Sequence, residues 1–443
     1  MYLAITDGTT TVVLSGTSPV LGCTYFPAAP TRNGGDWQPV TETAEVNLRG
    51  TAAAIRTTTN AVESLLDAAV DRQTLGVGPR VFALYKPVDA DSVTYRSEVY
   101  GGRLVWSDNP ALRRLGDTNP TVRVAVIWQR AYWWEGDEVE ASISANGQAA
   151  ATGGRTVTND PANGNWVQAA AAQVTGILPT PARLVLTNSS GATRKYAKLF
   201  LSLNANSDPA NLTVAYQGES ASGGGTPTAD AAASGGSKLN FSLSNSTATY
   251  YWTVSQANMQ RTKGRRARLV ARITDLSGSL YATPSVRTAS NEVLWDGDEV
   301  SLGPLIYGAW VDLGLVPLPP GGTNAAYAAA RVALTFRGTG IASLDVVQLT
   351  MIDSYRVLDL GASGIGMSDG TAIVVDGTEG QVYAATGGAN TSLPTNAAAA
   401  LMLQPGLVQR IHVLYHLADA GNYAPITTTM SVRVFYRPRR LTV

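Results

Sequence analysis

The stretch that decides the fold class is TVRVAVIWQRAYWW, which covers residues 121–134. From Val122 to Trp128 every second residue is a large apolar one, and the residues between them belong to the opposite face. A period of two is typical of a β-strand, because successive side chains of a strand point to opposite sides. The stretch therefore predicts a long, central strand.

One segment upstream departs from this pattern. Residues 51–72 contain no Pro or Gly, and Ile55, Val62, Leu66 and Ala69 follow one another at spacings of seven, four and three. These spacings place the four side chains on one face of an α-helix. We therefore expect a single amphipathic helix at about 51–72.

A glycine pair lies between the helix and the central strand. Residues 93–100 and 103–106 both have strand character, and Gly101 and Gly102 separate them. Two glycines between two strands are typical of a two-residue hairpin turn, which needs positive φ angles. The sequence predicts a β-hairpin at this point.

Most of the remaining chain also alternates with a period of two. We expect further strands at 80–86, 183–187, 197–203, 212–216, 239–243, 250–255, 267–274, 331–336, 343–351, 411–415 and 431–436. Two stretches rich in Gly, Ala, Ser and Thr, 143–165 and 217–237, are predicted to be long loops or linkers. Many strands at this spacing, without a second convincing helix, indicate a jelly-roll-like sandwich.

These patterns together predict a mainly β protein built from antiparallel β-sandwiches. We expect a β domain with one helix at residues 1–142 and a jelly-roll-like sandwich at 143–355. Residues 356–443 are expected to form a C-terminal β segment that packs on the other two parts.

The composition excludes several classes of protein. The chain has 443 residues, and its 33 basic side chains balance 33 acidic ones, so no overall field holds a polyanion. The single cysteine, Cys23, leaves no disulfide framework and no cysteine-based metal site, which favours assembly in a reducing compartment. The first residues lack the basic and apolar regions of a secretion signal, and no apolar stretch reaches the length of a membrane span. We expect no membrane partner.

Two motifs suggest enzymatic chemistry but lack its usual context. Residues 366–370 read GMSDG and match the nucleophile elbow G-x-S-x-G around Ser368, yet a β-branched strand follows instead of a helix. His412 and His416 alternate with apolar residues on a predicted strand and have no Glu or Cys at ligand spacing. We therefore predict no catalytic residue, no metal site and no cofactor. A Ser368 hydrolase or a glycan depolymerase stays as a rival hypothesis.

Arginines gather in two short runs, residues 261–268 and the C-terminal 436–440. Arginine outnumbers lysine by 28 to 5 in the chain, and its planar group suits fixed contacts at interfaces. We predict a subunit interface that uses the arginines of both runs. These are Arg261, Arg265, Arg266, Arg268, Arg437, Arg439 and Arg440.

Several aromatic residues in the predicted sandwich are candidates for stacking on sugar rings. Aromatic side chains in sandwiches belong mostly to the core, and a minority form binding platforms for oligosaccharides. The candidates are Trp166, Tyr251, Trp252 and Trp310.

Parts of the chain resemble a known family of virus proteins. The likeness rests on residues 40–72, on RSEVYGGRL at 96–104 with VAVIWQR at 124–130, and on the ending, residues 403–411 with 432–441. These stretches cover about a third of the chain and are similar to the distal tail and baseplate proteins of long-tailed, non-contractile bacteriophages. In that family an N-terminal β domain with one helix forms a hexameric ring under the tail tube, and a galectin-like or carbohydrate-binding sandwich is attached.

The resemblance implies a structural protein of the virion tail that is assembled in the host cytoplasm. Its implied partners are further copies of itself, the tail tube and the tail hub or fibre, and DNA passes through the ring only in transit. The alternative is a carbohydrate-binding adhesin of the tail, which attaches to host surface polysaccharide. No enzymatic activity is expected in either case.

Overall fold

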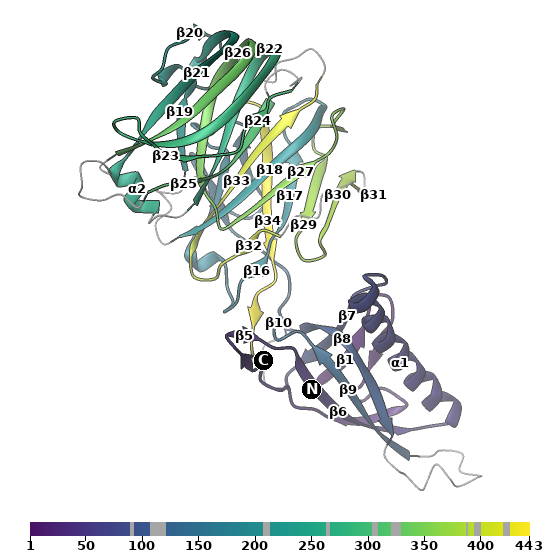
Figure 1. The fold of residues 1–443 in the computed structure, drawn as a ribbon. Helices are drawn as coiled ribbons and strands as arrows, with labels where there is room; N and C mark the ends of the chain where they lie inside the picture. The colour runs from purple at the N-terminus through teal and green to yellow at the C-terminus, as the bar shows by residue number, and fades with distance from the viewer. Residues whose placement is uncertain are drawn as a thin grey trace. The chain divides into compact units, whose positions relative to one another are not determined.

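A computed structural model describes most of the chain. It covers residues 1–88, 93–106, 121–206, 213–262, 266–303, 309–319, 329–386, 389–393, 400–419 and 426–443. Within these residues the protein is mainly β, with several antiparallel sheets and one long helix, as the sequence predicts (Figure 1). None of the described helices combines the length and the hydropathy needed to cross a bilayer.

The chain forms two compact units. Unit 1 comprises Met1–Val139, Thr175–Pro179 and Arg437–Val443, and unit 2 comprises Glu140–Val174 and Thr180–Tyr436. The chain therefore returns to unit 1 with its last seven residues. Strands from residues 356–436 belong to the sheets of unit 2.

Unit 1 is built on one nearly closed, antiparallel sheet in the order β2-β1-β7-β8-β9-β6-β3, with β10 and β35 beside it. The stretch 121–134 forms its central strand β9, and Val122, Val124, Val126 and Trp128 are buried as predicted. The strands are β1 (Tyr2–Thr6), β2 (Thr11–Val13), β3 (Val20–Thr24), β6 (Val40–Arg49), β7 (Val81–Lys86), β8 (Tyr95–Trp106), β9 (Thr121–Arg130), β10 (Trp134–Glu135) and β35 (Arg439–Arg440), with a separate pair β4 (Arg32–Asn33) and β5 (Asp36–Trp37).

The predicted helix is confirmed as α1, which spans Ala52–Leu75. The Thr51 hydroxyl caps its first turn by accepting a hydrogen bond from the Ala54 amide at 3.2 Å, and Gly76 ends it in the left-handed conformation. Its buried face includes Ile55, Val62 and Leu66, which join the core of the unit 1 sheet. The apolar face of α1 therefore covers the core of unit 1.

The predicted hairpin at Gly101 and Gly102 is wrong. Both glycines lie inside the continuous strand β8, at a bulge in its pairing with β9. A Cβ atom at Gly101 would lie 2.6 Å from Val70 Cγ2, and one at Gly102 would lie 2.9 Å from Leu66 Cδ2. The glycines let α1 approach the strand, so close packing and not a turn explains them.

Two sheets of unit 2 enclose its largest core, which includes Leu184, Val432, Leu201 and Val413. The strands of the β34 sheet are β11 (Val139–Glu140), β14 (Arg155–Thr158), β17 (Arg183–Asn188), β29 (Ala372–Asp376), β30 (Gln381–Thr386), β31 (Ala389–Ser392) and β34 (Thr429–Tyr436). Those of the β33 sheet are β12 (Ile143–Ala145), β13 (Gln148–Ala151), β15 (Trp166–Ala169), β18 (Arg194–Asn206), β27 (Ser354–Asp359), β28 (Ile365–Met367) and β33 (Val408–Leu417). Because β12, β13 and β14 lie in 143–165, the prediction of a loop or linker there is wrong.

A third sheet, here called the bent sheet, contains the longest strands (Figure 1). Its strands are β19 (Thr213–Gln217), β20 (Thr226–Ala229), β21 (Ser237–Ser255), β22 (Arg266–Thr288), β23 (Val293–Asp296), β24 (Val300–Ser301), β25 (Ala309–Pro317) and β26 (Ala329–Met351). The remaining elements of unit 2 are β16 (Thr180–Pro181), β32 (Met402–Leu403), α2 (Gln256–Thr262) and three 3-10 turns, η2 (Ala171–Gln173), η4 (Gly218–Ser220) and η5 (Ser234–Gly236). Since β20 and both later turns lie in 217–237, that stretch is also not a plain loop.

The bent sheet folds over on itself and forms a half-barrel. The predicted strands 239–243 and 250–255 are two halves of β21, and 331–336 and 343–351 are two halves of β26. Apolar side chains of both halves of each strand meet in one core. For example, the rings of Phe241 and Tyr250, on opposite sides of the bend in β21, lie 5.1 Å apart.

The pairing of the three long strands shifts register near the bend, at adjoining positions of β26. The β21–β26 pairing shifts register between Leu243 and Ser246, and the β22–β26 pairing shifts between Thr274 and Ser277. Gly338 of β26 has φ +125°, and a Cβ atom there would lie less than 3.0 Å from the Ser279 carbonyl oxygen. Glycine is therefore required where β26 crosses the bend.

Candidate functional site

Three of the seven arginines predicted at an interface are half-buried and have described partners in their own unit. Arg268 forms an ion pair with Asp312, Arg437 donates to the Gly136 carbonyl oxygen at 3.1 Å, and Arg439 pairs with Glu135 at 2.7 Å. Burial opposes ionisation of Glu135, but Arg439 and Arg96 outweigh it and hold the pKa of that carboxyl below its ordinary value. These arginines stabilise the fold, and their contact with another subunit stays a prediction.

The other four arginines carry less structural information. Arg440 is exposed and donates to the Tyr95 hydroxyl at 3.2 Å. Arg265 lies outside the described residues, and the side chains of Arg261 and Arg266 are not described. The described residues of 261–268 lie in unit 2, and Arg437–Val443 lie in unit 1.

The four predicted stacking residues are not gathered into one platform. Trp252 and Trp310 are both 3% exposed and belong to two different cores of unit 2. Trp166 lies under the Arg410 guanidinium at 3.9 Å, and Tyr251 lies under Arg331 at 4.4 Å. The two tryptophans are therefore closed to a sugar, and one face of each other ring is covered by arginine.

The motif residues lie on different elements of unit 2. Ser368 lies in an exposed turn after β28, and β29 follows it as a strand, as predicted. His412 and His416 lie on β33 and are buried, and burial lowers the pKa of His412 to about 3. His412 is therefore a neutral core residue. In the described part of the chain, no three His, Cys, Asp or Glu side chains are grouped as for a metal ion.

A buried ionic network joins elements of unit 2. Arg272 of β22 forms an ion pair with Asp345 of β26, and both side chains are almost fully buried. The Ser234 backbone amide donates a hydrogen bond to Asp345 at 2.8 Å, and the Ser234 hydroxyl donates one to Asp160 at 2.8 Å. Burial raises the pKa of Asp345 to about 6 against the effect of Arg272. Arg272 and Asp345 pair with each other, and Asp160 also accepts hydrogen bonds from Ala162 and Asn163, so we assign the network a structural role.

Unit 1 exposes an apolar surface that the sequence did not indicate. Phe26 is 84% exposed and Val88 is 73% exposed, whereas most large apolar side chains of the unit are buried. They line a groove of about 510 Å³ together with Met1, Cys23, Thr24, Tyr25, Tyr85, Pro87 and Val443. We call these nine residues the Phe26 surface.

The segment that carries Phe26 is held firmly. The preceding residue, Tyr25, is buried with its ring 5.3 Å from Tyr85 and 5.5 Å from Trp128. Buried Arg130 binds the Ala28 carbonyl oxygen at 3.0 Å and pairs with buried Glu42, which accepts from the Ala28 amide at 3.1 Å. The backbone that carries Phe26 is thus held in place in the free protein, so binding does not have to order this backbone.

Among the described residues, an edge strand of the unit 1 sheet lies beside the Phe26 surface. Strand β3, which ends two residues before Phe26, is the last strand of the unit 1 sheet and pairs with β6. Leu21 of β3 is 57% exposed. An edge strand with exposed apolar side chains is suited to pairing with another chain.

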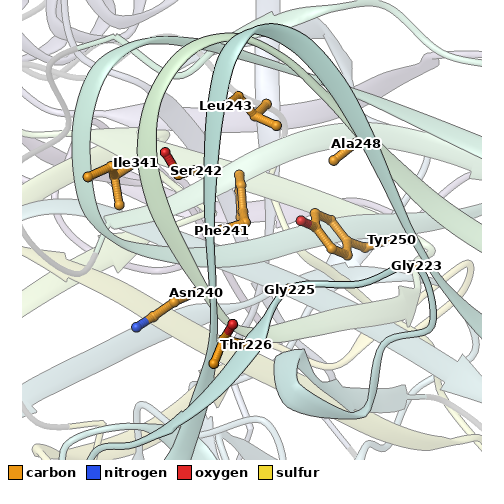
Figure 2. A pocket seen from close by; sticks show the side chains of 10 residues that line it. All are labelled: Gly223, Gly225, Thr226, Asn240, Phe241, Ser242, Leu243, Ala248, Tyr250 and Ile341. Carbon is orange, nitrogen blue, oxygen red and sulfur yellow. The ribbon is translucent and has the colours of Figure 1, made fainter.

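Unit 2 contains a hollow at the bend of the bent sheet (Figure 2). It has a volume of about 510 Å³, and its lining residues come from the segment before β20, from the first residue of β20, from β21 and from β26. They are Gly223, Gly225, Thr226, Asn240, Phe241, Ser242, Leu243, Ala248, Tyr250 and Ile341. Glycines in the middle of long strand-like stretches, Gly278 in LSGSL and Gly338 in RGTGI, are a sequence signal for such a bend.

No protein-family model matches this chain, and no curated protein matches it significantly. Among solved structures, isomalto-dextranase from Arthrobacter globiformis with panose aligns at 16% identity over 46% of this chain and 40% of its own length, with a TM-score of 0.25. Exo-β-1,3-galactanase from Phanerochaete chrysosporium aligns at 10% identity over 70% and 78%, with a TM-score of 0.20. Paenibacillus xanthan lyase aligns at 10% identity over 98% and 52%, with a TM-score of 0.25. Likenesses at these scores carry no argument about this chain.

Proposed function

We propose that this protein is a structural subunit of a bacteriophage tail whose unit 1 assembles copies of the chain into a ring. The family comes from the sequence resemblance, which implies six copies at the tail tip. The structural support is the Phe26 surface, a rigid, exposed apolar groove next to β3, which is an edge strand among the described residues. No reaction is part of the proposal.

Apolar exposure on this scale favours a permanent contact. Phe26 and Val88 are both more than 70% exposed. Burying one such side chain in an interface is favourable by about 1.5–3 kcal/mol. A stable interface removes about 1,200–2,000 Å² from water in total, so the edge of β3 contributes as well as the groove. Strand pairing and apolar burial together fit a second copy of the chain.

A ring requires that two different surfaces of the same unit meet. Contacts of this head-to-tail kind close into rings, whereas a surface that meets itself gives a two-fold dimer. Unit 1 offers a second apolar surface at the end of α1, where Leu75 is 68% exposed and Val77 is 56% exposed. We assign these two residues as the surface that receives the Phe26 surface of the next copy.

The test is the molar mass in solution by light scattering after size-exclusion chromatography. The wild type is expected as a closed oligomer, and Phe26→Asp and Val77→Asp are each expected as monomers. An equimolar mixture of the two variants restores one intact contact for each pair of chains, so it is expected to give dimers. Val293→Asp, at a residue of unit 2 that is 49% exposed, is the matched control and leaves the oligomer intact.

Other outcomes would contradict the proposal. A wild type that stays monomeric at every concentration rules out self-assembly of this chain. An oligomer that survives Phe26→Asp shows that another surface holds it. Failure of the mixture to form dimers, with both variants folded, removes the head-to-tail arrangement.

The alternative, an adhesin that stacks sugars on the predicted aromatic residues, has less support. Trp252 and Trp310 are closed inside cores, and Trp166 and Tyr251 are each covered by an arginine. The residues named from the sequence do not form a sugar platform, so we prefer the assembly role.

A further inference from the structure

We propose that the bent sheet is an inserted module that separates from the rest of unit 2 as a folded body. The residues that carry its strands, 213–351, are here called the insert. The β33 and β34 sheets, which enclose the largest core, are together called the sandwich. Every residue used below belongs to unit 2, so the proposal does not depend on the contacts between copies that we assign to unit 1.

The insert leaves and re-enters the sandwich at one place. Strands β18 and β27 are antiparallel neighbours with Leu203 opposite Ser354, and the Asp353 amide donates to the Leu203 carbonyl oxygen at 2.8 Å. A two-residue turn is enough to join such a pair, yet the whole bent sheet lies between these strands in sequence. The first and last strands of the insert are also paired, since Thr213 lies opposite Thr350. An insertion whose two ends lie together is able to fold as a body of its own.

The insert and the sandwich have separate hydrophobic cores. The buried core of the bent sheet consists of residues between 239 and 351, and the core of the sandwich contains none of them. Two neighbouring residues of β26 show the division, because Val347 belongs to the core of the bent sheet and Val346 to the contact with the sandwich. Each body therefore has the buried apolar surface that independent folding requires.

The contact between the two bodies, here called the seam, is small and incompletely packed. A small cavity lies in it, lined by Ser202 and His412 of the sandwich and by Gln348 and Thr350 of the insert, among others. Side chains that border a void lose packing contacts on that side. Among the described residues, the buried apolar part of the seam consists of Phe200, Val270, Trp310, Val346, Leu414 and Ile426.

Polar groups at the seam are only partly satisfied. Asn165 of the sandwich donates to the Gln348 side chain at 2.9 Å. In contrast, the indole N–H of Trp310 is buried and has no hydrogen-bond partner in the part of the chain that the structure describes. The same holds for both side-chain polar atoms of Asn204, which is fully buried on the same face of β18 as Phe200. A buried polar group without a partner costs free energy, and separation recovers it because water then reaches the group.

The ion pairs near the seam lie within one body. Arg268 pairs with Asp312 and Arg272 pairs with Asp345, and all four residues belong to the insert. None of the ion pairs that the structure describes in unit 2 joins the insert to the sandwich. Separation therefore breaks hydrogen bonds such as that of Asn165 but leaves the buried charges paired. We expect the seam to open while both cores stay folded, as weakly packed regions of native proteins do.

The test is thiol labelling of the full chain, followed by mass spectrometry of the peptide that contains each position, so that Cys23 need not be changed. Val346→Cys places a thiol in the seam, and Val347→Cys places one in the core of the bent sheet; both valines are 0% exposed. Without denaturant, the thiol at position 346 is expected to react at least about 10-fold faster than the thiol at position 347. Its rate should also depend less on urea, because opening the seam exposes less surface than unfolding.

A second matched pair tests the sandwich side of the seam. Leu414→Cys lies in the seam and Val413→Cys in the core of the sandwich, on the same strand β33, and the same difference is expected. Adding Val270→Asp, which places a charge in the seam, should raise labelling at position 346 further and leave the thiol at position 347 protected. Equal rates with equal urea dependence within both pairs would overturn the proposal. Loss of protection at position 347 on adding Val270→Asp would also overturn it, because the insert would then not stay folded without the seam.

Discussion

Replacement of Gly338 by alanine tests the physical origin of the half-barrel. Gly338 lies where β26 crosses the bend, opposite Ser246 of β21 and Leu280 of β22. Its φ of +125° is unfavourable for any residue with a side chain. The new methyl group would also press on the Ser279 carbonyl oxygen, which belongs to the neighbouring strand.

The expected loss has two parts. The unfavourable backbone angle costs about 1–2 kcal/mol, and forcing a methyl group into packed backbone costs about 1–3 kcal/mol. We expect Gly338→Ala to lower the free energy of unfolding of unit 2 by about 2–5 kcal/mol. The matched control is Gly224→Ala, which has φ +103° and no atom within 4 Å of its Cβ position. It carries only the first part, about 1–2 kcal/mol.

The assay is urea unfolding of the full chain, followed by tryptophan fluorescence. Hydrogen exchange with mass spectrometry assigns the transition to β21, β22 and β26. Equal losses in Gly338→Ala and Gly224→Ala would refute the account, because the carbonyl contact would then contribute nothing. A loss below about 0.5 kcal/mol would refute the need for glycine at the bend.

Three further predictions concern unit 1. Glu42→Ala leaves the buried Arg130 without its counter-ion and is expected to lower the free energy of unfolding by about 3–5 kcal/mol, measured by urea unfolding. The double change Glu42→Leu with Arg130→Met should lower it clearly less. An equal loss in both variants would contradict the view that the unpaired charge of Arg130 causes the loss. Arg439 and Arg96 outweigh burial and hold the pKa of Glu135 below its ordinary value of 4.5. The ionised Glu135 carboxylate therefore stabilises the fold above pH 4.5, and this stabilisation is lost as the pH falls through the lowered pKa. After correction for the intrinsic exchange rate at each pH, the amides of residues 437–443 should therefore be less protected from hydrogen exchange at pH 4 than at neutral pH. Glu135→Gln should remove this pH dependence. Thr51→Ala removes the cap of α1 and should cost about 1 kcal/mol, measured by thermal unfolding with circular dichroism, whereas Thr57→Ala on the exposed face should cost little.

Local patterns in the sequence predicted the elements of this fold well. The alternation in 121–134 and the spacing of Ile55, Val62 and Leu66 each report on the burial of one face of one element, which is a local property. Gly101 and Gly102 misled the prediction because a glycine pair looks the same whether it makes a turn or admits a helix.

The candidate sites depend on contacts that are distant in sequence. The hollow forms where β21 and β26 bend beside each other and a separate segment lies across the bend. No single stretch of sequence predicts that these three segments meet. Trp252 and Trp310 looked available for sugars, yet the folding of the bent sheet and its packing closed them off. No sequence pattern singles out Phe26, because its exposure follows from how Arg130 and Glu42 hold Ala28.

Electron microscopy of the purified full chain tests self-assembly most directly. We predict class averages that show closed rings of a single symmetry for the wild type, and separate single particles for Phe26→Asp under the same conditions. A wild type seen only as single particles, or rings that persist unchanged in Phe26→Asp, would contradict the proposal that unit 1 joins copies of this chain through the Phe26 surface.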